Sequence, residues 1–139
     1  MIWTAIVVQF AGYVFDALWH GLISRGVEPH TVDEMAWHLV TVHLPLYVGA
    51  LAVLVTTGLA LRQRSRTAAA LPIAFAGAVI SVAGEAWHAV SHLRLDTQHA
   101  PVAGSVSFVG FVVVVVAMIA SRRARRRPVS AARDEQRAA

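Results

Sequence analysis

Four long apolar stretches limit what this chain can fold into. They cover residues 2–24, 39–61, 68–92 and 101–120, and each holds the roughly 20 mostly apolar residues that a helix needs to cross a bilayer. Inside lipid, every backbone amide must be satisfied within the protein, which leaves helices and closed barrels. A chain of 139 residues is too short to cover four such segments with a soluble shell. We therefore predict an all-α integral membrane protein of the cell membrane, a bundle of four transmembrane helices.

The arginines predict the orientation of this bundle. Charged residues make up only 14% of the chain, and the arginines gather in the 62–67 connection and just after the fourth span. Cytoplasmic segments of membrane proteins carry such an excess of basic residues. Both termini should therefore be cytoplasmic, and the connections 25–37 and 93–100 should face outward. Since the basic residues flank apolar spans in this way, we expect contact with the lipid bilayer and no binding of nucleic acid.

The chain divides into two parts on the same grounds. Residues 1–121 form the predicted transmembrane domain, and residues 122–139 form an Arg-rich tail that we expect to be disordered and attracted to anionic lipid. The many small residues of the spans suit close helix packing, and they would also suit a homodimer.

Histidines lie on one side only. All of them fall in or beside the two connections that are predicted to face outward, and none falls in the cytoplasmic half of a span. They are His20, His30, His38, His43, His88, His92 and His99.

Helical spacing joins some of these histidines to acids. Asp16 and His20 are four residues apart, and Glu85, His88 and His92 follow one another at steps of three and four, so each set lies on one helix face. Asp16 and Glu85 are the acids within the spans, where an ionised side chain is costly and marks a functional site by default. The Glu-x-x-His step points a carboxylate and an imidazole at one interior point, as in carboxylate-bridged di-metal bundles.

A short internal repeat relates the two halves of the chain. Asp16–His20 and Glu85–His88 each run from an acid to a Trp-His pair, and His43–Pro45 and His99–Pro101 each read His-x-Pro with a glycine a few residues on. This order predicts two tandem two-helix repeats with the same orientation. Their pairing would place Asp16, His20 and His43 opposite Glu85, His88 and His99.

The connection before the second span adds further candidates. Thr31 and Glu34 have the spacing of a capping box and predict a helix start there. His38 then precedes His43 by five residues. On a straight helix this spacing points the two side chains in different directions, although Pro45 could bend that turn. We take His38 and His92 as additional ligands and His30 as a bystander.

The candidate site offers imidazole and carboxylate donors but no sulfur, and this choice of donors limits the metals that we expect it to bind. The chain has no cysteine, and its donor set suits iron first, zinc next, and manganese or copper after these. The candidate ligands exceed what one tetrahedral zinc needs, so we expect two ions. The predicted metal ligands are Asp16, His20, His38, His43, Glu85, His88, His92 and His99, with Asp16 and Glu85 also acting in catalysis.

Several functions fit such a site. We favour a non-haem, di-iron oxidoreductase that acts on a lipid-like or apolar molecule at the outer leaflet with an unidentified electron donor. The alternatives are a zinc-dependent intramembrane hydrolase with Asp16 or Glu85 as general base, a b-type haem protein with His20 and His88 as axial ligands, and a metal-binding or sensing protein without catalysis. The inner halves of the spans hold few polar residues, which argues against a transporter.

Overall fold

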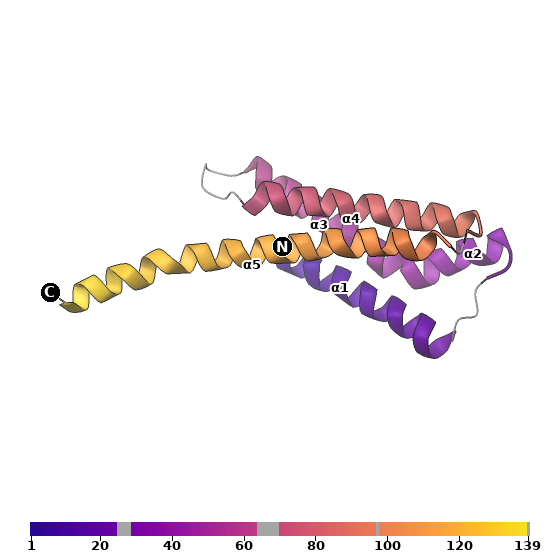
Figure 1. Ribbon diagram of the computed structural model, residues 1–139, viewed down its shortest axis with the longest axis horizontal. Coiled ribbons are helices and arrows are strands. Elements are labelled where there is room, and N and C mark those ends of the chain that lie inside the picture. The colour runs from indigo at the N-terminus through magenta and orange to yellow at the C-terminus, as the bar shows by residue number, and fades with distance from the viewer. Residues whose placement is uncertain (25–28, 64–69, 97, 139) are drawn as a thin grey trace.

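Helices make up almost all of the described chain. The computed structural model describes residues 1–24, 29–63, 70–96 and 98–138, with side chains up to residue 124 (Figure 1). Its elements are α1 (Ile2–Leu18), the π-helical turn η1 (Trp19–Ile23), α2 (Val32–His38), the π-helical turn η2 (Leu39–His43), α3 (Leu44–Arg62), α4 (Ala70–Leu93) and α5 (Ala100–Ala138).

Four of the resulting helical segments are long and apolar enough to cross a membrane. They are Ile2–Ile23, Val32–Arg62, Ala70–Leu93 and Ala100–Ala124. The prediction of an all-helical chain with four candidate spans is therefore confirmed. The second segment begins earlier than residue 39, because α2 and η2 continue directly into α3.

Neighbouring helices in the sequence pack as pairs through glycines. α1 lies along α3, α4 lies along α5, and α3 also contacts α4. A Cβ atom on Gly49 would stand 2.4 Å from the Cα of Gln9, and one on Gly84 would stand 2.4 Å from the backbone nitrogen of Ser107. Each pair therefore approaches so closely that only glycine fits. Two tandem two-helix repeats would produce this pairing, and the repeat relation itself stays a prediction.

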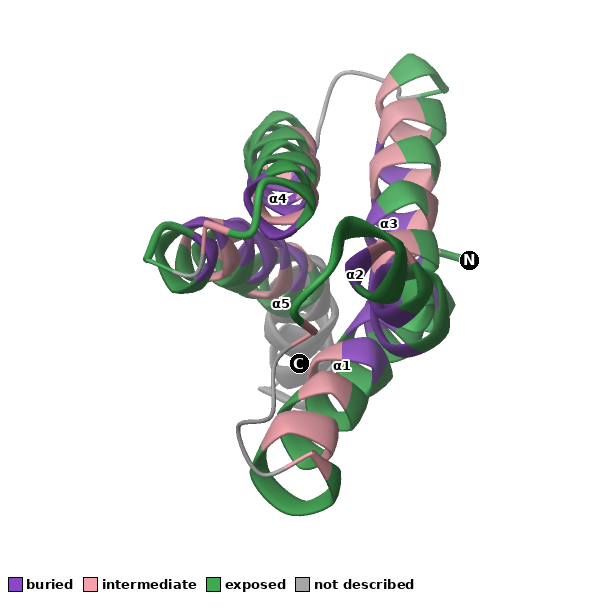
Figure 2. Ribbon diagram, turned by 90° about the vertical axis from the view of Figure 1, so that its right-hand side faces the viewer, coloured by how far each residue is buried: buried purple, intermediate pink, exposed green. Residues whose placement is uncertain are grey.

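The apolar core fills the half of the bundle nearer the N-terminus. Its members come from the first turns of α1 and α4, the second half of α3 and the middle of α5, and Ile6, Val53, Ala74 and Val114 are among them. Buried residues line the inner faces of the helices, and exposed ones face outward (Figure 2). Buried polar residues such as His43 and Glu85 lie towards the other half. This end carries the 24–31 and 94–99 connections.

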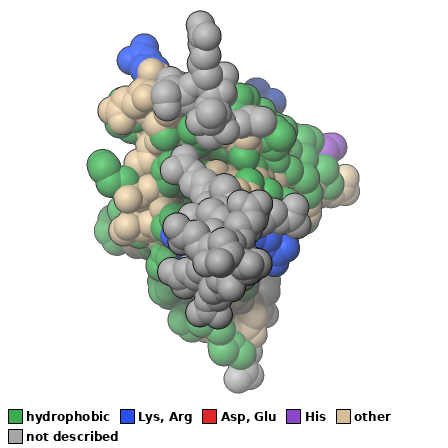
Figure 3. All heavy atoms as spheres, turned by 90° about the vertical axis from the view of Figure 1, so that its left-hand side faces the viewer, with side chains coloured by type: hydrophobic (Ala, Val, Ile, Leu, Met, Phe, Trp, Pro, Cys, Tyr) green, Lys and Arg blue, Asp and Glu red, His purple; other side chains and the backbone are tan. Residues whose placement is uncertain are grey.

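The helix α5 is longer than the sequence predicted. Its backbone is helical to Ala138, where we expected a disordered tail from residue 122. Alanine and arginine, which dominate this segment, are both good helix formers. Arg122 lies over the ring of Trp3, 3.9 Å from its centroid, which ties α5 to the start of α1. From that end of the molecule, arginine side chains are seen among mainly hydrophobic ones (Figure 3).

The predicted capping box at the start of α2 is confirmed. Thr31 Oγ1 accepts a hydrogen bond from the Glu34 amide at 3.3 Å, and Glu34 Oε2 accepts one from the Thr31 amide at 3.3 Å. These bonds satisfy two amides that the helix itself leaves without partners.

Replacing Thr31 with alanine should therefore weaken α2 locally. We expect a loss of about 1 kcal/mol and amide exchange in α2 faster by roughly fivefold. Hydrogen exchange read by mass spectrometry measures this. Thr56→Ala is the control, since the Thr56 hydroxyl bonds only within its own helix, to the carbonyls of Ala52 and Val53. Unchanged exchange in α2 of Thr31→Ala would contradict the capping role.

Candidate metal centre

Five of the seven histidines converge at the end of the bundle that carries the 24–31 and 94–99 connections. They come from three of the four candidate spans and form two groups of three. The groups are His20, His38 and His43, and His43, His88 and His92. Within each group the ligand atoms all lie within 4.8 Å of one another.

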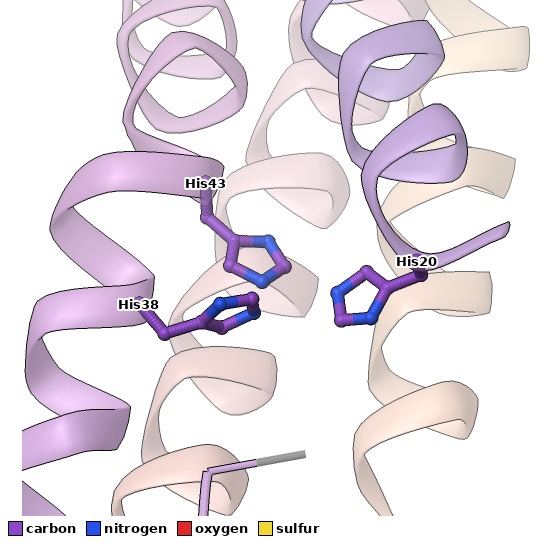
Figure 4. Close-up of side chains that lie close together, drawn as sticks. All are labelled: His20, His38 and His43. Carbon is purple, nitrogen blue, oxygen red and sulfur yellow. The ribbon is translucent and has the colours of Figure 1, made fainter. Parts of the chain in front are cut away.

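His43 belongs to both groups and is the centre of the site. Its side chain is 1% exposed, and its ring centroid lies 5.1 Å from those of His38 and His88. The rings of His20, His38 and His43 turn towards one another from two helices (Figure 4). The Nε2 of His43 makes no hydrogen bond with the described residues, and its Nδ1 has the carboxylate of Asp16 as a neighbour. Because such buried polar atoms are costly without a partner, a bound cation would be stabilised here.

A π-helical turn brings His38 and His43 together. In an α-helix, residues five apart point in different directions, but the wider η2 turn, Leu39–His43, places them on one face. Pro45 lies in the first turn of α3 and has no amide to donate back to the carbonyl of Thr41, which favours this wider turn. The predicted bend before Pro45 therefore takes the form of a π-helical turn.

The first helix contributes a second π-helical turn and a carboxylate. In η1 the Ser24 amide donates to the Trp19 carbonyl at 2.8 Å, a step of five residues. Asp16 Oδ1 lies 3.2 Å from His43 Nδ1 and 3.6 Å from His20 Nε2. The predicted pair of Asp16 and His20 thus lies at the site, where the negative charge would stabilise a bound cation.

His88 is held in one orientation from outside the cluster. Its Nδ1 lies 2.8 Å from the carbonyl oxygen of Ala100, which can only accept, so Nδ1 carries the proton. In the neutral ring, Nε2 then has the lone pair that binds a metal. This atom lies 3.0 Å from His92 Nε2. Ligand nitrogens of a tetrahedral zinc site are separated by roughly 3.3 Å, so this spacing suits a shared ion.

Glu85 lies on the same face of α4 but belongs to neither group. Its Oε1 accepts a hydrogen bond from Ser107 Oγ at 2.5 Å, and Ser107 is also bonded to Tyr13 and Ser81. The structure therefore places this predicted ligand among hydroxyl groups, one turn of α4 before His88. Sequence reasoning missed Ser81 and Ser107 by treating them as small packing residues. Their presence in apolar spans beside an acid was the available signal.

His99 and His30 lie apart from the cluster. His99 Nδ1 is 2.7 Å from Asp96 Oδ2, and both side chains are exposed. The hydrogen bond from His99 holds the pKa of Asp96 below its ordinary value. His92, and not the predicted His99, stands next to His88. His30 is exposed, and its amide donates to Glu34.

The site and the fold together define a class of protein. The chain is an all-helical protein with four candidate membrane spans and a largely buried histidine cluster that could bind a metal ion. No model of a protein family, no curated protein and no solved structure matches it. The chemistry of the site is therefore the basis on which its function is inferred.

Proposed function

We propose that this chain is a membrane metalloenzyme, a non-haem oxidoreductase that binds two transition-metal ions, preferably iron, and acts on an apolar or lipid-like molecule. One observation carries the proposal: two groups of three histidines share the buried His43. A neutral imidazole offers one lone pair, and loss of its N–H proton frees the second, so His43 would serve both groups as a bridging imidazolate. Histidine and carboxylate donors without sulfur are the ligands that non-haem iron prefers.

The geometry favours small ions over a haem. A bis-histidine haem needs a flat apolar slot between its two axial ligands. His20 and His88 are the predicted axial pair, and the ring of His43 is a neighbour of both. Its centroid lies 5.9 Å from that of His20 and 5.1 Å from that of His88. A porphyrin ring would have to displace His43.

Access and charge also suit an enzyme. His20 and Asp16 are each 26% exposed, whereas His43 is buried, so the α1 side of the site is the more accessible one. Bound iron would supply the reaction with oxygen and the transfer of electrons. Asp16 would stabilise the cationic centre and accept a proton from the substrate, while the surrounding helices exclude bulk water.

Metal analysis of the purified full chain tests the proposal. We expect about two iron ions per chain after loading with Fe(II) without oxygen, and oxygen uptake on exposure to air. Binding should weaken on acidification, because protons compete with the metal for imidazole. Zinc binding with hydrolytic activity would favour the hydrolase instead, and iron binding without oxygen uptake would favour a sensor. A chain that binds no metal, or binds haem, would overturn the proposal.

A further inference from the structure

A second buried polar cluster lies deeper in the bundle than the histidines. It consists of Gln9 and Tyr13 from α1, Ser81 and Glu85 from α4, and Ser107 from α5. Gln9, Ser81, Glu85 and Ser107 are at most 4% exposed. Four polar side chains from three helices are thus linked by hydrogen bonds to one carboxyl group, at a position where apolar spans would otherwise pack.

The hydrogen bonds of this cluster all lead towards Glu85. Ser107 Oγ donates its only proton to Glu85 Oε1, so it accepts from Tyr13 at 2.7 Å and from Ser81 at 3.1 Å. Gln9 Nε2 in turn donates to Ser81 Oγ at 2.8 Å. This orientation stabilises an ionised Glu85. Hydroxyl groups can also rotate and accept, so the same cluster can hold a protonated carboxyl.

Other titratable groups face Glu85 from two further directions. Asp16 of α1 lies close enough to act on Glu85 electrostatically. Both carboxylates act on the phenol of Tyr47 in α3, whose buried hydroxyl makes no hydrogen bond with the described residues. Within α4 the next titratable group is His88, and among the described residues α5 contributes only the uncharged Ser107. Like charges on Asp16 and Glu85 oppose simultaneous ionisation, and a metal cation among the histidines would reduce that repulsion.

We propose that Glu85 stores a proton that is coupled to metal binding. This inference rests on the proposed metal centre. Without metal, Glu85 holds a proton on its carboxyl; when a divalent cation binds to the histidines, the proton leaves and the carboxylate balances part of the added charge. Ser107 is the positioning residue, because its hydrogen bond stabilises the ionised form. Linkage is reciprocal, so ionised Glu85 also strengthens metal binding.

The proton leaves towards the histidines and not through the bundle. Beyond Gln9 the described interior is mainly apolar, with Ile6 and Val53 in its core, and the buried hydroxyl of Thr57 there is bonded to carbonyls of its own helix. The ring of Tyr47 lies 6.0 Å from that of His43, on the histidine side of Glu85.

Counting protons during zinc binding tests this inference. The full chain in detergent is titrated with Zn²⁺ in weakly buffered solution from about pH 5.5 to 8.5, with a pH dye as the readout and the bound zinc measured in parallel. At saturating zinc we expect Glu85→Gln to bind as many ions as the unaltered chain, with a lower affinity because the carboxylate is lost. It should release fewer protons, with a maximal deficit of about one proton per chain. Ser107→Ala should move this maximum to higher pH, because the carboxylate loses a donor.

Thr57→Val is the matched control. Among the described residues, the buried Thr57 hydroxyl bonds only to its own helix, so its loss should leave the proton count unchanged. An infrared difference spectrum of the unaltered chain should also show the band of a protonated carboxyl disappearing when zinc binds. Equal proton release by Glu85→Gln at every pH, or failure of this variant to bind zinc even at saturating concentration, would overturn the inference while the metal centre stands. A chain that binds no zinc and no iron would overturn both.

Discussion

Replacing His43 with alanine should remove metal binding from both groups of histidines at once. His43 is the residue that the groups share, and loss of a partner that merely orients a ligand already costs 10- to 100-fold in affinity. We therefore expect metal affinity to fall by more than about 100-fold in His43→Ala. Isothermal titration with Zn²⁺, and with Fe(II) in the absence of oxygen, measures it.

Single replacements elsewhere distinguish the two groups. His20→Ala and His92→Ala each remove a ligand from one group only, so each variant should retain about half of the bound metal. His99→Ala is the matched control, because its imidazole is bonded to Asp96 in an exposed connection. Full metal binding by His43→Ala would contradict a shared ligand. Loss of metal from His99→Ala would support the ligand set predicted from the repeat instead.

The second large effect concerns helix packing, and Gly84→Ala should destabilise the bundle. The new Cβ would stand 2.4 Å from the backbone nitrogen of Ser107, and a backbone atom cannot move aside as a flexible side chain can. Separating α4 from α5 should cost about 1–3 kcal/mol, as overpacking does in well-packed cores. Reversible unfolding in mixed micelles, followed by circular dichroism, measures the free energy of unfolding.

Gly21→Ala is the control for this replacement. A Cβ at Gly21 meets no atom within 4 Å, so only helix propensity changes, and alanine is favoured there by up to about 1 kcal/mol. We expect this variant to be as stable as the unaltered chain or slightly more stable. Equal stability of Gly84→Ala and Gly21→Ala would show that the close α4–α5 contact is not required.

The features that sequence predicted well are those that depend on a single helix. Hydropathy and length identify the four candidate spans, because a backbone in lipid must satisfy its own hydrogen bonds. The capping box at Thr31 is a contact between residues three apart, and the face shared by Asp16 and His20 follows from helical pitch. The orientation in the membrane and the two-helix repeat remain predictions.

The metal centre shows where such reasoning stops. From spacing alone, His38 and His43 should point in different directions on a straight α-helix. The π-helical turn before Pro45 instead brings both side chains onto one face. The repeat predicted His99 beside His88, but the 94–99 connection turns His99 away to Asp96, and His92 lies in its place. Helical spacing placed Glu85 on the same helix face as His88. In the structure, however, its carboxyl accepts a hydrogen bond from Ser107 on the next helix.

By itself, then, the sequence determined a helical membrane bundle and the gathering of histidines at one end of it. These follow from local rules, the apolar length of each span and the position of each histidine along it. Only the tertiary structure decided which five imidazoles meet and which carboxyl stands apart. Those outcomes depend on how closely glycines let the helices approach and on where a turn widens, and neither is a property of one segment alone.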